Sequence, residues 1–281
     1  MKPKFVPSLV IAGLLASTPV SAAPAVPVTR SVEGFSDLAD LTLGAPIILR
    51  AMVAKADRLG PKDAPDLPPG RVRLLVQATV QAAILAPSAV APTIRYLWEL
   101  PADARGKPPK LKGATILLFA RPVPGREDQI VPTGPNSQIS ATPTAEANVR
   151  RIIAENRDPM VRDLRITGVT SAFHVAGSIA GEAETQIFLG TANQRPVSLV
   201  VLSRPGQSQS FSFASGDVID DAATPISVNS MLWYRLACAL PATLPAGAAR
   251  EMVEGDRVAA AADYRFVIQS LGPCGRSLRT N

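Results

Sequence analysis

Residues 71–85 constrain the fold more than any other part of the chain, because polar and apolar side chains alternate along the stretch. The apolar set is Val72, Leu74, Val76, Ala78, Val80, Ala82 and Ile84, and the polar set is Arg71, Arg73, Gln77, Thr79 and Gln81. A period of two is the signature of a half-buried strand. Such a strand would be roughly 45 Å long if straight, which exceeds the width of a small domain. We therefore expect it to curl and to pair with two neighbours, as long strands in small barrels do.

Other strand-like segments surround this stretch. The expected strands are 46–56, 93–100 and 114–120, with a weak fifth strand at 129–131 or 138–140. Residues 38–43 are expected to form a turn that leads into the first strand. Short connections favour antiparallel neighbours, so residues 38–141 are predicted to form a five-stranded barrel or a small sandwich.

One motif gives this part of the chain a likeness to a known fold. After the long strand, Lys112-Gly113 and two further residues precede the run Ile116-Leu117-Leu118-Phe119. This arrangement resembles the OB-like barrels of exported netrin-type modules. The resemblance covers residues 38–141 and implies an OB-like β-barrel, but it assigns no functional residue. The chain lacks the cysteines that many such modules use.

Helix signals follow the predicted barrel, and we place a domain boundary at residue 141. Thr142 is a suitable N-cap for a helix with Pro143 in its first position, and Asp158-Pro159 repeats this signal for a shorter helix. Residues 142–281 are therefore predicted to form a mixed α+β domain. The chain as a whole is expected to have a β-rich α+β fold, with its C-terminal part tied by one disulfide.

The strands expected in the second domain lie at 166–169, 172–175, 185–190, 197–204 and 208–213. Two later segments are harder to assign. Residues 232–240 fit both a helix and a strand, and Ser230 as a cap with Pro241 as a stop favours the helix. Residues 264–271 are predicted to be a strand, because Tyr264, Phe266 and Ile268 share one face at a period of two.

The first 22 residues have the layout of a secretory signal peptide. Two lysines precede a short apolar run, and small residues precede the expected cleavage after Ala22. The run is too short to span a membrane, and an uncleaved anchor is the alternative. Residues 23–37 are expected to form a flexible arm. The mature chain is expected to lack a transmembrane segment and to be periplasmic or secreted, and its layout resembles that of exported bacterial proteins with no assigned activity.

Cys238 and Cys274 are the only cysteines of the chain. An even number of cysteines in an oxidising compartment predicts a disulfide, and two buried free thiols are the alternative. A bridge across about 36 residues would stabilise the fold by roughly 3–4 kcal/mol in the chain-entropy treatment. A metal site is disfavoured, because the pair lacks companion ligands.

Few residues of the chain could perform catalysis or hold a metal. His174 is the only histidine, so any Ser–His mechanism must use it, and no Gly-x-Ser-x-Gly motif is present. In a strand, Glu182 and Glu184 would point the same way and could bind a cation or act as acid and base. The alternatives are a structural or surface histidine and two solvated carboxylates. Asp220-Asp221 is expected to be a loop, and the sequence predicts no cofactor and no metal.

Charge and composition decide between classes of partner. The formal charge is +6, or 6 − 2 = +4 without Lys2 and Lys4. Nucleic-acid binding would require a basic patch with stacking aromatics, and aromatics make up only 5% of the chain, so no nucleic acid is expected. The leading hypothesis is an exported, non-enzymatic binding or structural protein, whose partner is an envelope protein or ligand. The alternative is a periplasmic hydrolase that uses His174 with Glu182/Glu184, which must then converge in one cleft.

Overall fold

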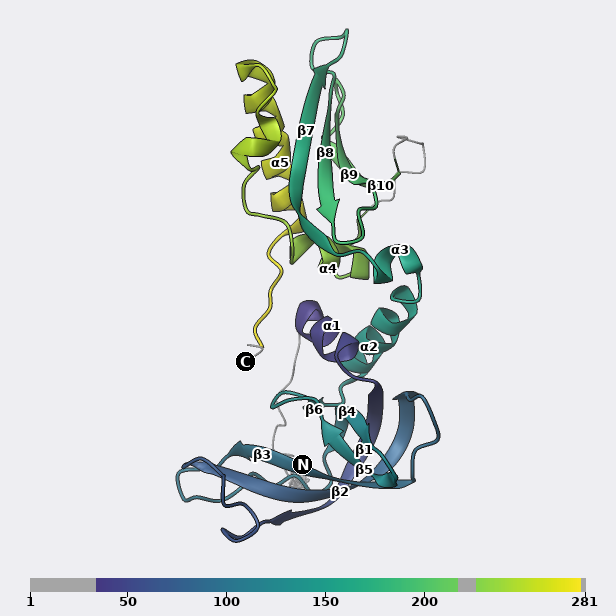
Figure 1. Ribbon diagram of the computed structural model, residues 1–281, viewed down its shortest axis with the longest axis vertical. Coiled ribbons are helices and arrows are strands. Elements are labelled where there is room, and N and C mark those ends of the chain that lie inside the picture. The colour runs from purple at the N-terminus through teal and green to yellow at the C-terminus, as the bar shows by residue number, and fades with distance from the viewer. Residues whose placement is uncertain (1–33, 217–225, 279–281) are drawn as a thin grey trace, which may run out of the picture.

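The long alternating stretch forms β2 (Arg71–Leu85), the longest strand of a closed barrel (Figure 1). The structure, a computed structural model, describes residues 34–216 and 226–278. β2 pairs along its length with β1 (Ile47–Arg58) on one side and with β3 (Thr93–Pro101) on the other. The predicted curled strand with two neighbours is therefore confirmed. The signal peptide, most of the predicted arm and Asp220-Asp221 lie outside the described residues.

Two further strands close the barrel. β4 (Thr115–Val123) pairs with β1 and with β5 (Arg126–Pro132), and β5 meets β3 in parallel. The result is a closed, mixed barrel of five strands, as the OB-like resemblance implies. A short sixth strand, β6 (Gln138–Ser140), pairs with residues 116–118 of β4, on the same edge as β5. Both of the weak candidate segments are therefore strands.

The barrel is filled from within by alternate side chains of its strands. Val72, Leu74, Val76 and Ala78 of β2 are almost completely buried, and they meet Ile116 and Leu118 of β4 in one hydrophobic cluster. The polar alternate positions of β2 are on the outer surface. This division explains the period of two in the sequence.

Three helices precede the second sheet and lie outside the barrel. They are α1 (Phe35–Leu43), α2 (Pro143–Glu155) and α3 (Pro159–Arg162), and α1 and α2 lie between the barrel and the second sheet (Figure 1). Thr142 Oγ1 accepts the Ala145 N–H at 3.1 Å, so the predicted cap is present. The predictions for residues 35–43 are wrong. Residues 35–37 were assigned to the flexible arm and residues 38–43 to a turn, and both segments are helical. Phe35, Leu38, Ala39 and Thr42 repeat every three or four residues and are buried.

The second sheet contains four antiparallel strands in the order β10-β9-β8-β7. Their bounds are β7 (Ile166–Ala176), β8 (Ala183–Thr191), β9 (Val197–Ser203) and β10 (Ser210–Ser215). The predicted hairpin between 185–190 and 197–204 is confirmed. α4 (Met231–Ala237), η1 (Ala246–Ala249) and α5 (Glu254–Leu271) follow. Ser230 caps α4 by accepting the Trp233 N–H at 3.1 Å, so the preference for a helix in this segment was correct.

The predicted strand at residues 264–271 is wrong, because this segment is the second half of α5. The buried residues of α5 are Ala260, Tyr264, Val267 and Leu271, which are spaced by four, three and four positions. That spacing places them on one face of a helix against the second sheet. Phe266 and Ile268 are only partly buried, so the period of two was coincidental.

One hydrophobic cluster joins the two halves of the chain. It contains Leu38 of α1, Phe119 of β4, Val149 of α2 and Ile187 of β8. The two sheets therefore share a core, and the domain boundary at residue 141 stays a prediction. Among the described helices, none combines the length and apolar character needed to cross a bilayer.

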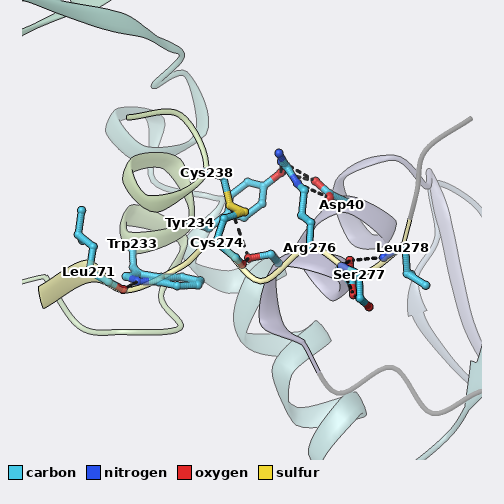
Figure 2. Close-up of a disulfide and its surroundings, with 11 residues drawn as sticks. Asp40, Trp233, Tyr234, Cys238, Leu271, Cys274, Arg276, Ser277 and Leu278 are labelled. Carbon is cyan, nitrogen blue, oxygen red and sulfur yellow. Dashed lines mark hydrogen bonds and ion pairs between the residues drawn. A yellow bond between two sulfur atoms is a disulfide. The ribbon is translucent and has the colours of Figure 1, made fainter. Parts of the chain in front are cut away.

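After α5 the chain returns to α4 and α1, where it is fixed by a disulfide and by two aspartates (Figure 2). The predicted bridge is confirmed, because Cys238 and Cys274 are joined with an S–S distance of 2.07 Å. Asp37, which is buried, accepts the backbone N–H groups of Ser277 and Leu278 at 2.9 and 3.0 Å, and it also accepts the Ser277 hydroxyl. The tail thus supplies the donors that this buried carboxylate needs.

Asp40, one turn later on α1, binds the tail through its charge (Figure 2). Arg276 donates to both carboxylate oxygens, at 2.7 and 3.0 Å, and its guanidinium lies 5.4 Å from the centre of the Tyr234 ring. Tyr234 also donates to Asp40. Burial raises the pKa of Tyr234 and the neighbouring Asp40 raises it further, so the phenol stays a donor near neutral pH.

Replacing Asp37 with Ala is expected to lower the free energy of unfolding by about 2–3 kcal/mol, because the N–H groups of the tail lose their buried acceptor. Asp63→Ala is the matched control, since Asp63 is exposed, and its effect should stay within about 0.5 kcal/mol. Urea denaturation under oxidising conditions measures both values. Equal effects in the two variants would show that the tail does not anchor α1.

Candidate functional site

His174 lies on β7 opposite Thr185 of β8, on the sheet face that α5 covers. Its Nδ1 atom is 2.7 Å from Thr185 Oγ1, and Thr185 in turn donates to Asp263 of α5. Gln209 donates to the other oxygen of Asp263 at 2.6 Å. Since Thr185 gives its one hydroxyl proton to Asp263, the imidazole must donate from Nδ1. Asp263 therefore orients His174 through an intervening hydroxyl, and its Oδ2 atom is also 3.5 Å from Nδ1 of the ring.

The two predicted glutamates lie on the other face of the sheet. Glu184 is opposite Val175, one position along from the pair of His174 and Thr185, and neighbouring positions of a strand face opposite sides. Glu182 and Glu184 line one pocket of about 470 Å³ together with Phe173, Val175 and Arg204.

The structure thus brings the two glutamates together and separates them from His174. His174 lines a different pocket beside η1, which also contains Arg250 and Asp256. The convergence that the hydrolase hypothesis requires is absent from these two pockets. Within residues 34–216 and 226–278, no group of three or more His, Cys, Asp or Glu side chains is placed to hold a metal ion.

A pocket that sequence reasoning did not single out opens in the barrel and has a volume of about 400 Å³. Its walls come from the end of β3, the following loop and the turn before β6. Apolar and ring-bearing residues form most of its lining: Trp98, Leu100, Pro101, Pro109, Leu111 and Pro135. Pockets with mostly apolar walls and a few polar groups are typical of sites for small molecules.

The polar group of most interest in this pocket is the side-chain amide of Gln138. Gln138 is 4% exposed, and its Oε1 atom accepts the Tyr96 hydroxyl at 2.6 Å. Its Nε2 atom is buried and has no hydrogen-bond partner among the described residues. An unpaired buried amide costs roughly 1–3 kcal/mol. Turning the amide around would leave Oε1 unpaired instead, because the Tyr96 hydroxyl can satisfy only one of the two atoms.

The local chain geometry explains how Gln138 reaches this position. The turn before β6 is fixed by Ser137, whose hydroxyl donates to the Gly134 carbonyl and whose backbone carbonyl accepts the Phe119 N–H at 2.8 Å. β6 then pairs with β4 in a register that sets Gln138 opposite Leu118. Leu118 belongs to the barrel core, so the amide is directed to the same interior as Tyr96.

Tyr96 is a neutral donor in this site, because burial raises its pKa well above the ordinary value for tyrosine. Two charged residues also line the pocket, and they contact each other. Arg71 donates to the Glu99 carbonyl at 3.1 Å, and its Nε atom is 3.9 Å from the Glu99 carboxylate. Arg73 donates to Glu99 and Asp66, and these hydrogen bonds raise the pKa of Arg73.

Comparison with known proteins gave no family for the chain: no protein-family model matches it, and no curated protein matches it. The barrel pocket differs from the pockets of His174 and of the two glutamates because one of its lining residues, Gln138, carries a buried polar atom without a partner among the described residues. The only other such atom within the described residues, Thr42 Oγ1, lines none of these pockets.

The hydrogen bonds at His174 predict the Nδ1–H tautomer for the neutral ring. Asp263→Asn should convert it to the Nε2–H tautomer. Gln209 would hold the new amide oxygen, so the amide nitrogen would donate to Thr185, whose proton would then go to Nδ1. Long-range ¹H–¹⁵N spectra of this single histidine measure the tautomer. Asp256→Asn, a change in the same pocket, should leave it unaltered, and an unchanged ring in Asp263→Asn would contradict the proposed hydrogen bonds.

Proposed function

We propose that this chain is an exported, non-enzymatic binding protein of the cell envelope, which holds a small ligand in the barrel pocket. A volume of about 400 Å³ lies in the usual range for ligand sites. The pocket supplies apolar walls, one aromatic ring and a small set of polar groups. That combination is suited to recognition of a small molecule.

The observation that carries the proposal is the unpaired Nε2 atom of Gln138. Buried polar groups are almost always hydrogen-bonded, and each exception needs an explanation. A ligand that accepts a hydrogen bond from this amide would remove the cost of leaving it unpaired. The atom belongs to a residue that lines a pocket large enough to hold such a ligand. An unpaired donor and space for a ligand therefore occur at the same residue.

Export is supported by the sequence of residues 1–22 and is compatible with the disulfide. Disulfides persist mainly in oxidising compartments, and Cys238–Cys274 ties the tail to α4. The hydrolase hypothesis receives less support, because His174 and the two glutamates line different pockets.

Intact mass of the natively exported protein tests its location. We expect the loss of residues 1–22 and no reaction of the cysteines with an alkylating agent until a reductant is added. A full-length mass with two reactive thiols would contradict export, and it would return intracellular partners to consideration.

The role of the amide is tested by removing it with and without its partner. Gln138→Met alone is expected to lower the free energy of unfolding by about 1–2 kcal/mol, because the Tyr96 hydroxyl then loses its acceptor. Tyr96→Phe with Gln138→Met removes both polar groups at similar volume. The double variant should be as stable as the native chain or about 1 kcal/mol more stable, as measured by urea denaturation.

Binding is read from the same two proteins by ¹H–¹⁵N spectra during titration with a fragment set of neutral, anionic and cationic compounds. At least one compound should shift the Trp98 indole signal and the Gln138 side-chain signal of the native chain. The double variant should need about five- to tenfold more of that compound to give the same shift at Trp98. If no compound of any charge class shifts these signals, the barrel pocket is not a ligand site and the proposal fails.

A further inference from the structure

We infer that the barrel pocket takes an uncharged molecule with an apolar, ring-containing body and one carbonyl oxygen. This inference rests on the ligand-binding function proposed above and specifies the chemistry of the ligand. Three properties of the lining residues lead to it: the buried donor of Gln138, the apolar side chains of the walls and the pairing of the charged side chains.

Gln138, one of the residues that line the pocket, carries a neutral donor that is itself buried. Gln138 Nε2 carries N–H groups without an acceptor, while its Oε1 atom is already used by the Tyr96 hydroxyl. A group placed against Nε2 must therefore accept a hydrogen bond. A carbonyl oxygen does so without bringing protons of its own.

The walls of the pocket favour an apolar ring next to that carbonyl. Trp98 is 8% exposed and offers an aromatic surface, and three proline rings and two leucine side chains also line the pocket. Rigid rings lose little side-chain entropy when a ligand packs against them. A flat or compact apolar body is therefore the best match for this surface.

The charges of the pocket disfavour both an anionic and a cationic ligand. Arg71 is the only cation among the lining residues, and it donates to the Glu99 carbonyl and lies 3.9 Å from the Glu99 carboxylate. A carboxylate buried against the neutral amide would lack a free cation, and burying an unpaired charge is costly. An ammonium group would meet the N–H donors of Gln138 and would leave them unpaired. A neutral acceptor avoids both penalties.

Three ligands with the same ring separate these cases: acetophenone, benzoate and benzylammonium. Acetophenone and benzoate have nearly the same shape, so their comparison isolates the charge. Tryptophan fluorescence gives the dissociation constants for the native chain. The chain has two tryptophans, and the control Trp98→Phe assigns the response to the pocket. We expect acetophenone to bind at least tenfold more tightly than either charged ligand.

The variant Tyr96→Phe with Gln138→Met should weaken acetophenone binding by about five- to tenfold, because it removes the donor and retains the apolar walls. Preferential binding of benzoate or benzylammonium would overturn the inference about ligand class and would leave the proposed binding function standing. Equal affinity of acetophenone for the native chain and the variant would show that Gln138 does not recognise the carbonyl. Absence of binding by all three ligands, together with an empty fragment titration, would overturn the binding function itself.

Discussion

The strand β4 is apolar on both of its faces, and the rest of the structure depends on covering both. Its inward residues, Ile116 and Leu118, fill the barrel, whereas its outward residues, Leu117 and Phe119, belong to the other hydrophobic cluster. A strand with two apolar faces is stable only where both are packed. α1 and α2 supply the outer cover, and α2 leads the chain on to the second sheet. The barrel and the second sheet are joined by a shared core for this reason.

The cover on β4 is itself held in place by the end of the chain. α1 is short and has no side-chain cap at its start, so its own backbone contributes little stability. Asp37 and Asp40 connect α1 to the tail, and Cys274 connects the tail to α4. Residues more than 200 positions apart thus hold α1 against the barrel. The disulfide therefore acts on the whole arrangement, because the tail can anchor α1 only while the tail itself is fixed.

Local periodicity was sufficient to predict the strands of the barrel, the hairpin of the second sheet and the capped helices. It failed at residues 264–271, where Tyr264 satisfies both a period of two and a helical spacing, and only the packing of α5 decides between them. The contacts between His174 and Asp263 and between Tyr96 and Gln138 join distant strands and helices, so no local pattern contains them. A glutamine at the start of a short strand was the single available signal for the pocket, and it became informative only through the register of β6 on β4.

That register also argues for a functional origin of the amide. Gln138 faces Leu118 in an interior whose cluster is apolar apart from the Tyr96 hydroxyl, and an apolar side chain there would form the fold at lower cost. Tyr96 does not require a partner at this position either, because phenylalanine would fill the same volume without a hydroxyl. The Tyr96 hydroxyl and Gln138 Oε1 are hydrogen-bonded to each other, whereas Gln138 Nε2 is unpaired. A buried polar pair with one unpaired atom is less stable than an apolar pair. Folding alone therefore gives no reason for the amide, whereas a ligand carbonyl at Nε2 would complete its hydrogen bonds and make the same residues a recognition site.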